Sequence, residues 1–248
     1  MKRVLKILQI VYSVYAMLLF VILMLIVVPF VFLSSLLGKK RGGNLVYIIC
    51  RWWAILWYFF IFIRHKEIFV ASHNKERQYI FVANHRSYLD IPELMRAMHQ
   101  PVRVLGKHDL AKVPIFGIIY RAAAVLVDRS SRENRAKSVA MMKDVLASGM
   151  SIFIFPEGTF NETGQPLKDF YDGAFRIALE TGTPIKPIIF PDTIKRFHYE
   201  SIFSFTPGIC RAIYLEELSV QGLDKTDTRA LKQKVYAVME EALTKFGI

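Results

Sequence analysis

Cysteine is scarce in this chain of 248 residues, which contains only Cys50 and Cys210. Two thiols so far apart in the sequence provide neither a disulfide framework nor the ligand spacing of a zinc site. Cys50 also lies inside an apolar stretch. The cysteine content therefore indicates a reducing compartment and excludes a small disulfide-stabilised fold.

Acidic residues are absent from the first quarter of the chain. Residues 1–63 contain seven lysines and arginines, which is more than half of the net charge of +12. No Cys/His zinc module or Gly-rich RNA-binding signature accompanies this charge, so nucleic acid is not the expected partner. Because the basic residues flank apolar segments, we expect contact with the anionic headgroups of a lipid bilayer.

The same region is unusually rich in long hydrophobic runs. Residues 7–37 contain no charged side chain, and this run exceeds the roughly 20 residues that cross a hydrocarbon core. It predicts a helix in a membrane rather than a cleavable signal peptide, since it is too long and no A-x-A-like site follows. Residues 45–63 form a second apolar stretch, in which Arg51 lies beside Trp52 and Trp53. These residue types favour the membrane interface.

The basic residues lie before, between and after the two apolar stretches, so the positive-inside rule gives no clear orientation. The second stretch could lie in the interface or return as half of a hairpin. We favour a shallow hairpin that keeps all three basic clusters on one side of the membrane.

From residue 66 onward, short apolar runs alternate with amphipathic stretches. This alternation predicts an α/β domain with a mostly parallel central sheet flanked by helices, in which functional residues collect where strands end. The expected strands are 66–71, 78–83, 102–106, 124–128, 151–155, 185–190 and 209–215. The expected helices are 90–99, 114–121, 132–148, 172–181 and 227–246.

Two residues that can share a proton follow one of these strands. His85 and Asp90 lie five positions apart after the apolar run 79–83. Histidine exchanges a proton near neutral pH, and a carboxylate can hold its tautomer and stabilise its cation. Pro92 requires any helix here to begin close by. We therefore expect His85 in a loop and Asp90 at the helix entry, reaching back across the turn.

A simpler interpretation of this stretch is a helix cap. Asp90 could be an ordinary N-cap, with Glu93 completing a capping box, or Ser87 and Asp90 could form a looser cap. On local sequence alone, capping is favoured. The catalytic interpretation therefore depends on the rest of the chain.

Other strand ends carry further candidates. Lys107 and Arg129 follow two strands and could converge on one anion, although each alone is better explained as a solvated cation. In Glu157-Gly158-Thr159, glycine allows a ligand close to the backbone and the glutamate could orient a hydroxyl or pair with a cation. An ordinary strand-exit turn would explain the same residues.

Together these stretches resemble the glycerolipid acyltransferases, and among them the PlsC-type 1-acylglycerol-3-phosphate acyltransferases. The four blocks of that family occur here in family order, over about residues 64–220. They are matched by Asn84-His85 with Asp90 (N-H-x4-D), by the apolar run that ends in Asp128-Arg129, by Phe-Pro-Glu-Gly-Thr at 155–159, and by Thr-Pro-Ile-Lys-Pro-Ile at 183–188.

The chain departs from the family pattern beside the third block. The family usually continues with Arg-Ser, where this chain has Phe160-Asn161, and usually places basic residues where 170–172 reads Phe-Tyr-Asp. Either Lys168 or Arg176 replaces the missing charge, or the acceptor is not a simple phosphate monoester.

The resemblance implies that a fatty acyl group moves from acyl-CoA or acyl-carrier protein to the sn-2 hydroxyl of lysophosphatidic acid, giving phosphatidic acid. No cofactor, metal or serine nucleophile is required, and Ser87 is expected to be a turn residue. The implied roles are general base for His85, its partner for Asp90, phosphate binding for Lys107 and Arg129, and lining of the acceptor site for Glu157, Gly158 and Thr159.

The resemblance also assigns residues 1–63 to a membrane anchor and residues 64–248 to a catalytic domain, which we expect on the cytoplasmic side of the cell membrane. Three alternatives remain open. The same chemistry could act on another lysolipid, glycerol 3-phosphate or an aminoacyl lipid. The pair could activate water in a thioester or lipid hydrolase. The chain could also be a non-catalytic lipid-binding scaffold, in which His85 and Asp90 only cap a helix.

Overall fold

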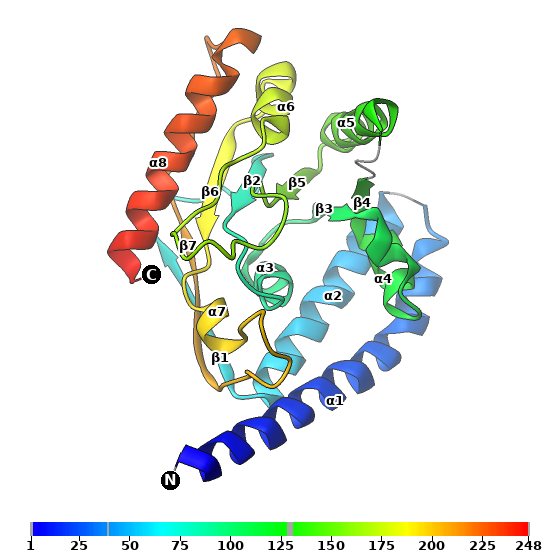
Figure 1. Ribbon diagram of the computed structural model, residues 1–248. Coiled ribbons are helices and arrows are strands. Elements are labelled where there is room, and N and C mark those ends of the chain that lie inside the picture. Colours follow the sequence, from blue (N-terminus) through cyan, green and yellow to red (C-terminus); the bar gives the residue numbers. More distant parts are fainter. Residues whose placement is uncertain (1, 39, 128–130, 248) are drawn as a thin grey trace.

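The computed structural model describes residues 2–38, 40–127 and 131–247, and a single mixed sheet lies at its centre (Figure 1). The described strands follow the order β1-β7-β6-β2-β5-β3-β4, and all neighbours are parallel except β6 and β7. They are β1 (Ile63–Phe69), β2 (Ile80–Ala83), β3 (Val102–Lys107), β4 (Ala124–Val127), β5 (Ser151–Ile154), β6 (Ile185–Ile189) and β7 (Gly208–Tyr214). The predicted α/β fold with a mostly parallel sheet is confirmed.

Helices connect the parallel strands, because such strands cannot be joined by tight turns. Most lie within a few residues of their predicted bounds, whereas the short elements η1, α7 and η2 were not predicted. The helical elements are α1 (Lys2–Ser35), α2 (Arg41–Phe60), α3 (Asp90–Ala97), η1 (His108–Lys112), α4 (Phe116–Ala123), α5 (Arg132–Ala147), α6 (Gly173–Thr181), α7 (Thr193–Arg196), η2 (Lys225–Asp227) and α8 (Thr228–Phe246).

The central strand β2 is buried on both faces of the sheet. Ile80 and Val82 join a hydrophobic cluster with residues of α5, α6 and α8. Phe81 and Ala83 join a second cluster, with residues of α2 and α3. Because successive side chains of a strand point to opposite faces, a short apolar run without alternation marks a strand covered on both sides.

The two N-terminal helices form an antiparallel hairpin. The Tyr12 hydroxyl donates to the Ile61 carbonyl, and Trp57 Nε1 donates to the Ala16 carbonyl at 2.9 Å. The Phe20 ring packs edge-on against Trp57. Another side of α2 packs on the sheet, so α2 connects α1 to the rest of the fold.

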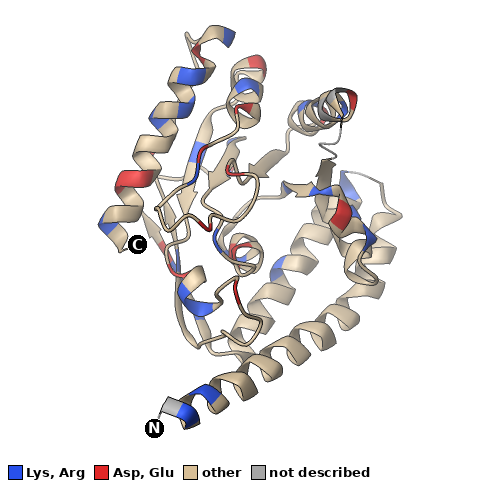
Figure 2. Cartoon of the chain, viewed as in Figure 1, with Lys and Arg blue, Asp and Glu red and all other residues tan. Residues whose placement is uncertain are grey.

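Within the described residues, the segment Arg3–Ser35 of α1 is the one helix long and apolar enough to cross a membrane. Most of its side chains are exposed. Figure 2 shows that its charged residues are confined to its N-terminal end, and that neither α1 nor α2 carries an acidic residue. Large exposed apolar surfaces of this kind usually mark a site of interaction with a partner or a membrane.

The carboxyl ends of β2, β5 and β6 meet at one edge of the sheet, because these three strands are parallel neighbours. The segments that leave this edge are residues 84–89, 155–161 and 190–192. Loops from distant parts of the sequence are thereby brought side by side.

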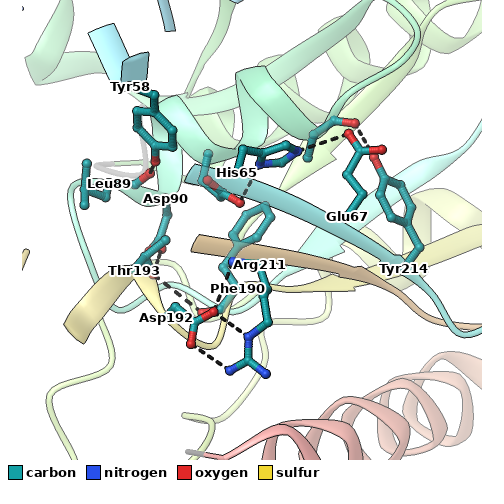
Figure 3. Close-up of polar contacts among 12 residues, drawn as sticks. Tyr58, His65, Glu67, Leu89, Asp90, Phe190, Asp192, Thr193, Arg211 and Tyr214 are labelled. Atoms are coloured by element: carbon teal, nitrogen blue, oxygen red, sulfur yellow. Dashed lines mark hydrogen bonds and ion pairs between the residues drawn. The ribbon is translucent and has the colours of Figure 1, made fainter. Parts of the chain in front are cut away.

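A partly buried ionic cluster connects α3 to the edge strand β1. The His65 ring lies 2.9 Å from Glu93 through Nδ1 and 3.1 Å from Glu67 through Nε2, and His99 Nε2 lies 2.8 Å from the other Glu67 oxygen. Figure 3 shows His65 and Glu67 facing each other. Because both His65 nitrogens face carboxylates, the doubly protonated ring fits this position.

Burial by itself lowers the pKa of His65, but hydrogen bonds with Glu67 and Glu93 outweigh it and raise the pKa to about 9. Burial raises the pKa of Glu67, but hydrogen bonds from His65 and His99 outweigh it and lower the pKa to about 2. Both shifts favour the charged pair in the folded state.

The raised pKa of His65 predicts a pH-dependent loss of stability on the alkaline side. Its ordinary value is about 6.5 and its folded value about 9, so the stabilisation is complete below pH 6.5 and is lost as the pH rises through 9. We expect the free energy of unfolding in detergent to fall by about 1–3 kcal/mol over this range.

The measurement is denaturant unfolding at several pH values. In His65→Gln, the free energy of unfolding should depend less on pH between 6.5 and 9. In His198→Gln, at a more exposed site, its dependence on pH should be unchanged. The same dependence on pH in the wild type and in His65→Gln would show that His65 does not cause the alkaline loss of stability.

Candidate active site

The candidate site begins at the end of β2, where Asn84 joins two strands. Its side-chain amide donates to the Phe190 carbonyl at 3.1 Å, and its Oδ1 accepts from the Phe190 N–H at 2.7 Å. Asn84 is fully buried. These two bonds align the ends of β2 and β6, from which the next residues leave the sheet.

His85 and Asp90 are in direct contact. His85 Nδ1 lies 2.8 Å from Asp90 Oδ2, and the same oxygen accepts from the backbone N–H groups of Arg86 and Ser87, each at 2.8 Å. The Asp90 side chain is fully buried, whereas the His85 side chain is 16% exposed. The carboxylate therefore holds both the histidine ring and the loop that carries it.

An N-cap at Asp90 with a capping box to Glu93 does not describe this geometry, whereas part of the looser Ser87–Asp90 cap is present, because the Ser87 N–H donates to Asp90 Oδ2 and Ser87 Oγ accepts from the Leu89 N–H. Asp90 is the first residue of α3, Leu89 is the N-cap, and no side chain caps the helix. The Glu93 carboxylate bonds to His65 instead of closing a capping box. The Asp90 carboxylate also contacts the His85 ring, with 2.8 Å between Oδ2 and Nδ1.

Aromatic rings enclose the His85 ring and leave one nitrogen available. The Phe155 ring stacks on it at a centroid distance of 4.0 Å, and the Phe160 ring meets it edge-on at 4.4 Å. Within the described part of the chain, His85 Nε2 has no hydrogen-bond partner. With the proton on Nδ1 facing Asp90, Nε2 is free to accept a proton.

Glu157 lies beneath this histidine, fully buried. One of its oxygens accepts from the His85 backbone N–H at 2.7 Å and the other from the Lys168 backbone N–H at 2.8 Å. Burial raises the pKa of Glu157 to about 7, although both N–H groups act in the opposite direction. The structure thus places Glu157 as a support of the His85 backbone, with both of its oxygens bound to the main chain.

The Lys168 ammonium lies beside the rest of this loop, which contains Gly158 and Thr159. Gly158 has a positive φ of 75°, and its N–H donates to the Phe155 carbonyl at 3.0 Å. Glycine adopts this backbone conformation without strain. The Lys168 ammonium donates to the Thr159 hydroxyl at 2.9 Å. Lys168, one of the two replacements considered from the sequence, therefore brings its charge to the tip of the loop.

Lys107, another predicted cation, is not in contact with His85. Lys107 ends β3 with a side chain that is 76% exposed and lies 3.5 Å from Asp109. Arg129 lies outside the described residues. Ser87 donates to the Phe197 carbonyl at 2.6 Å and accepts from the Leu89 N–H at 3.1 Å, which is the behaviour expected of a turn residue.

Sequence reasoning missed one residue that touches the site. Thr193 donates to the second oxygen of Asp90 at 2.5 Å. It follows the strand predicted at 185–190 and so leaves the same sheet edge, which is the signal that could have found it. Within the described ranges, no group of three or more His, Cys, Asp or Glu side chains could hold a metal ion.

Comparisons with known proteins show which family this chain belongs to. The family model described as Acyltransferase matches residues 60–191, more than half of the chain. This chain belongs to the acyltransferase family. The matched region contains His85, Asp90 and the Glu157 loop, and it ends two residues before Thr193.

Named relatives of this acyltransferase come from bacteria and animals. The 1-acyl-sn-glycerol-3-phosphate acyltransferase of Haemophilus influenzae is 26% identical over 213 residues, covering 84% of this chain and 85% of that protein. The human 1-acyl-sn-glycerol-3-phosphate acyltransferase alpha is 29% identical over 175 residues, or 68% of this chain and 60% of the human protein.

A solved structure has the same fold. The crystal structure of the 1-acyl-sn-glycerophosphate acyltransferase PlsC from Thermotoga maritima aligns with a TM-score of 0.75 at 22% identity, covering 99% of this chain and 98% of that one. The resemblance inferred from the four sequence blocks is thereby confirmed.

The position of Glu157 leads to a prediction. In Glu157→Gln, the side-chain NH2 would face one of the two backbone N–H groups, replacing a charged hydrogen bond with a donor–donor contact. We expect a loss of about 1–3 kcal/mol in the free energy of unfolding, together with lower acyl transfer because the His85 backbone shifts.

Glu162→Gln, at an exposed position in the following loop, is the matched control. Denaturant unfolding and acyl-transfer rates of both variants provide the measurement. Wild-type values for Glu157→Gln would show that this carboxylate does not support His85.

Proposed function

We propose that this enzyme is a membrane-bound 1-acyl-sn-glycerol-3-phosphate acyltransferase, which transfers a fatty acyl group from acyl-CoA or acyl-carrier protein to lysophosphatidic acid. The observation that carries the proposal is the 2.8 Å contact between His85 Nδ1 and Asp90, with Nε2 left free at a partly exposed sheet edge. The names of the bacterial and human relatives support the choice of acceptor.

In this mechanism His85 Nε2 removes the proton from the sn-2 hydroxyl as its oxygen attacks the thioester carbonyl. Asp90 keeps the proton of the ring on Nδ1 and stabilises the imidazolium that forms. When the tetrahedral intermediate collapses, the C–S bond breaks, the ester remains on the acceptor, and the thiolate recovers the proton from His85. No covalent acyl-enzyme is needed, which agrees with Ser87 being engaged in a turn.

We propose that residues 1–63 anchor the catalytic domain, residues 64–248, at the inner face of the cell membrane. The outer side of α1 would enter the lipid, while α2 stays attached to the sheet through its buried side. Exposed Trp52 and Phe59 on α2 suit the interfacial region. A shallow hairpin in one leaflet would place the acceptor lipid and the sheet edge at the same level.

The direct test of the function is turnover by the purified protein. With acyl-CoA or acyl-carrier protein and lysophosphatidic acid it should form phosphatidic acid, and His85→Ala should lower the rate by about 10²–10⁴-fold while the fold persists. His198→Ala is the control histidine.

Other outcomes separate the alternatives. Unchanged turnover in His85→Ala would refute the mechanism. Release of free fatty acid without any acceptor would indicate a hydrolase. Lipid binding that survives His85→Ala, with no turnover from either donor, would indicate a scaffold.

We further propose that Lys168, together with Lys107 and Arg129, receives the acceptor phosphate near the loop of Glu157, Gly158 and Thr159. Lys168 is held beside Thr159, so it brings a charge to the loop that also supports His85.

We expect Lys168→Ala to raise the KM for lysophosphatidic acid by about 10-fold, with little change in the KM for the thioester. Monoacylglycerol, which lacks the phosphate, should be used equally well by both proteins. Lys234→Ala, on the exposed side of α8, is the control. An unchanged KM in Lys168→Ala would remove Lys168 from the phosphate site and favour a different acceptor, to be found with a panel of lysolipids.

A further inference from the structure

We propose that Thr193 is a positioning residue for acyl transfer, because it holds the Asp90 carboxylate in the orientation that His85 needs. This inference rests on the proposed function. Thr193 and Asp90 are both fully buried, and the Thr193 hydroxyl donates to Asp90 Oδ1 at 2.5 Å (Figure 3). Thr193 lies outside the region matched by the family model.

The Asp90 carboxylate is bound on both oxygens. Oδ2 accepts from the His85 ring and from two backbone N–H groups, whereas Oδ1 accepts from Thr193. The torsion that turns a carboxylate about its Cβ–Cγ bond is soft. Bonds to Oδ2 alone would let the group tilt, so the fourth bond fixes its plane.

The Thr193 hydroxyl has one hydrogen and two acceptors in reach. The Asp90 oxygen lies at 2.5 Å and the Phe190 carbonyl at 3.5 Å. The distance to Asp90 is that of a strong, charge-assisted hydrogen bond, whereas the distance to the Phe190 carbonyl is at the limit of a hydrogen bond. The hydrogen therefore points to Asp90.

The chain that leads to Thr193 is held at two points. Asn84 binds both main-chain groups of Phe190, after the end of β6. Asp192, the residue before Thr193, forms a bidentate ion pair with Arg211 of β7, at 2.6 Å to Nε and 2.7 Å to Nη2. Figure 3 shows Asp192 and Arg211 directed toward each other below Thr193.

Tilting of Asp90 would affect the reaction through the His85 ring. A tilted Asp90 would bind the Nδ1 proton less well, so a smaller fraction of His85 would carry its proton on Nδ1 and leave Nε2 able to accept one. Because Thr193 is fully buried, we expect neither substrate to touch it. Loss of its hydroxyl should therefore lower kcat and leave both KM values unchanged.

The test compares Thr193→Val with Thr193→Ser in full-length protein in detergent micelles. Thr193→Val keeps the shape and removes the hydroxyl, and we expect kcat to fall by about 10- to 100-fold, with each KM within about twofold. Thr193→Ser restores the donor and should recover most of kcat. Thr181→Val removes a threonine hydroxyl that bonds within α6 and should have no effect.

Two further measurements keep the inference testable if Thr193→Val folds poorly or turnover is absent. Arg211→Lys should lower kcat at constant KM, because lysine cannot form the bidentate pair that holds Asp192. Nitrogen-15 NMR of labelled histidine should show a smaller Nδ1–H fraction for His85 in the Thr193 variants, whatever substrate the enzyme uses.

Wild-type kcat in Thr193→Val, with an unchanged His85 tautomer, would overturn the positioning role. A rise in KM with constant kcat would do the same. If wild-type protein forms no phosphatidic acid but the Thr193 variants alter the His85 tautomer, then the proposed function fails and the positioning role stands.

Discussion

The structure of the site depends on one buried carboxylate. Asp90 is removed from water and must have its oxygens bound by donors, because a buried charge without partners is costly. Its four donors come from the loop after β2 and from the start of α7. Satisfying this single group therefore requires the ends of β2 and β6 to lie side by side, and the same arrangement sets the orientation of His85.

A second buried acid, Glu157, holds the main chain of His85 in place. Glu157 joins the His85 N–H to the Lys168 N–H, and the Asn161 N–H donates to the His85 carbonyl at 2.7 Å. The histidine is thus held through its ring by Asp90 and through its main chain by the loop after β5. The role proposed for His85 depends on such support, since misplacement of a catalytic group by about 1 Å can cost a hundredfold in rate.

Helix α2 packs both on the apolar helix α1 and on the sheet that carries the candidate site. One side of this helix contributes to the core around Phe81 and the other contacts α1. Because α2 contacts both, movement of α1 and α2 relative to the sheet would disturb a hydrophobic core. The proposed attachment to the bilayer would therefore hold the sheet edge at a defined distance from the lipid surface.

Much of this could be predicted from local patterns. Apolar runs of strand length indicated most of the strands, and the alternation with amphipathic stretches indicated a mostly parallel sheet. The uncharged run at 7–37 predicted the long apolar helix α1. His85 and Asp90 were paired from their spacing and from Pro92, although local sequence favoured a cap, because a short polar motif fits several structures equally well.

The sequence by itself determined most of the helices and strands, the long apolar segment and the residue types at each strand end, because these follow from periodicity and composition. Only the tertiary structure decided which strand ends meet. It brought Thr193 onto Asp90, placed Glu157 beneath the His85 backbone, and put Lys168 beside Thr159 while Lys107 extends into solvent. These contacts join residues far apart in the chain, and their existence depends on strand order, which no local pattern contains.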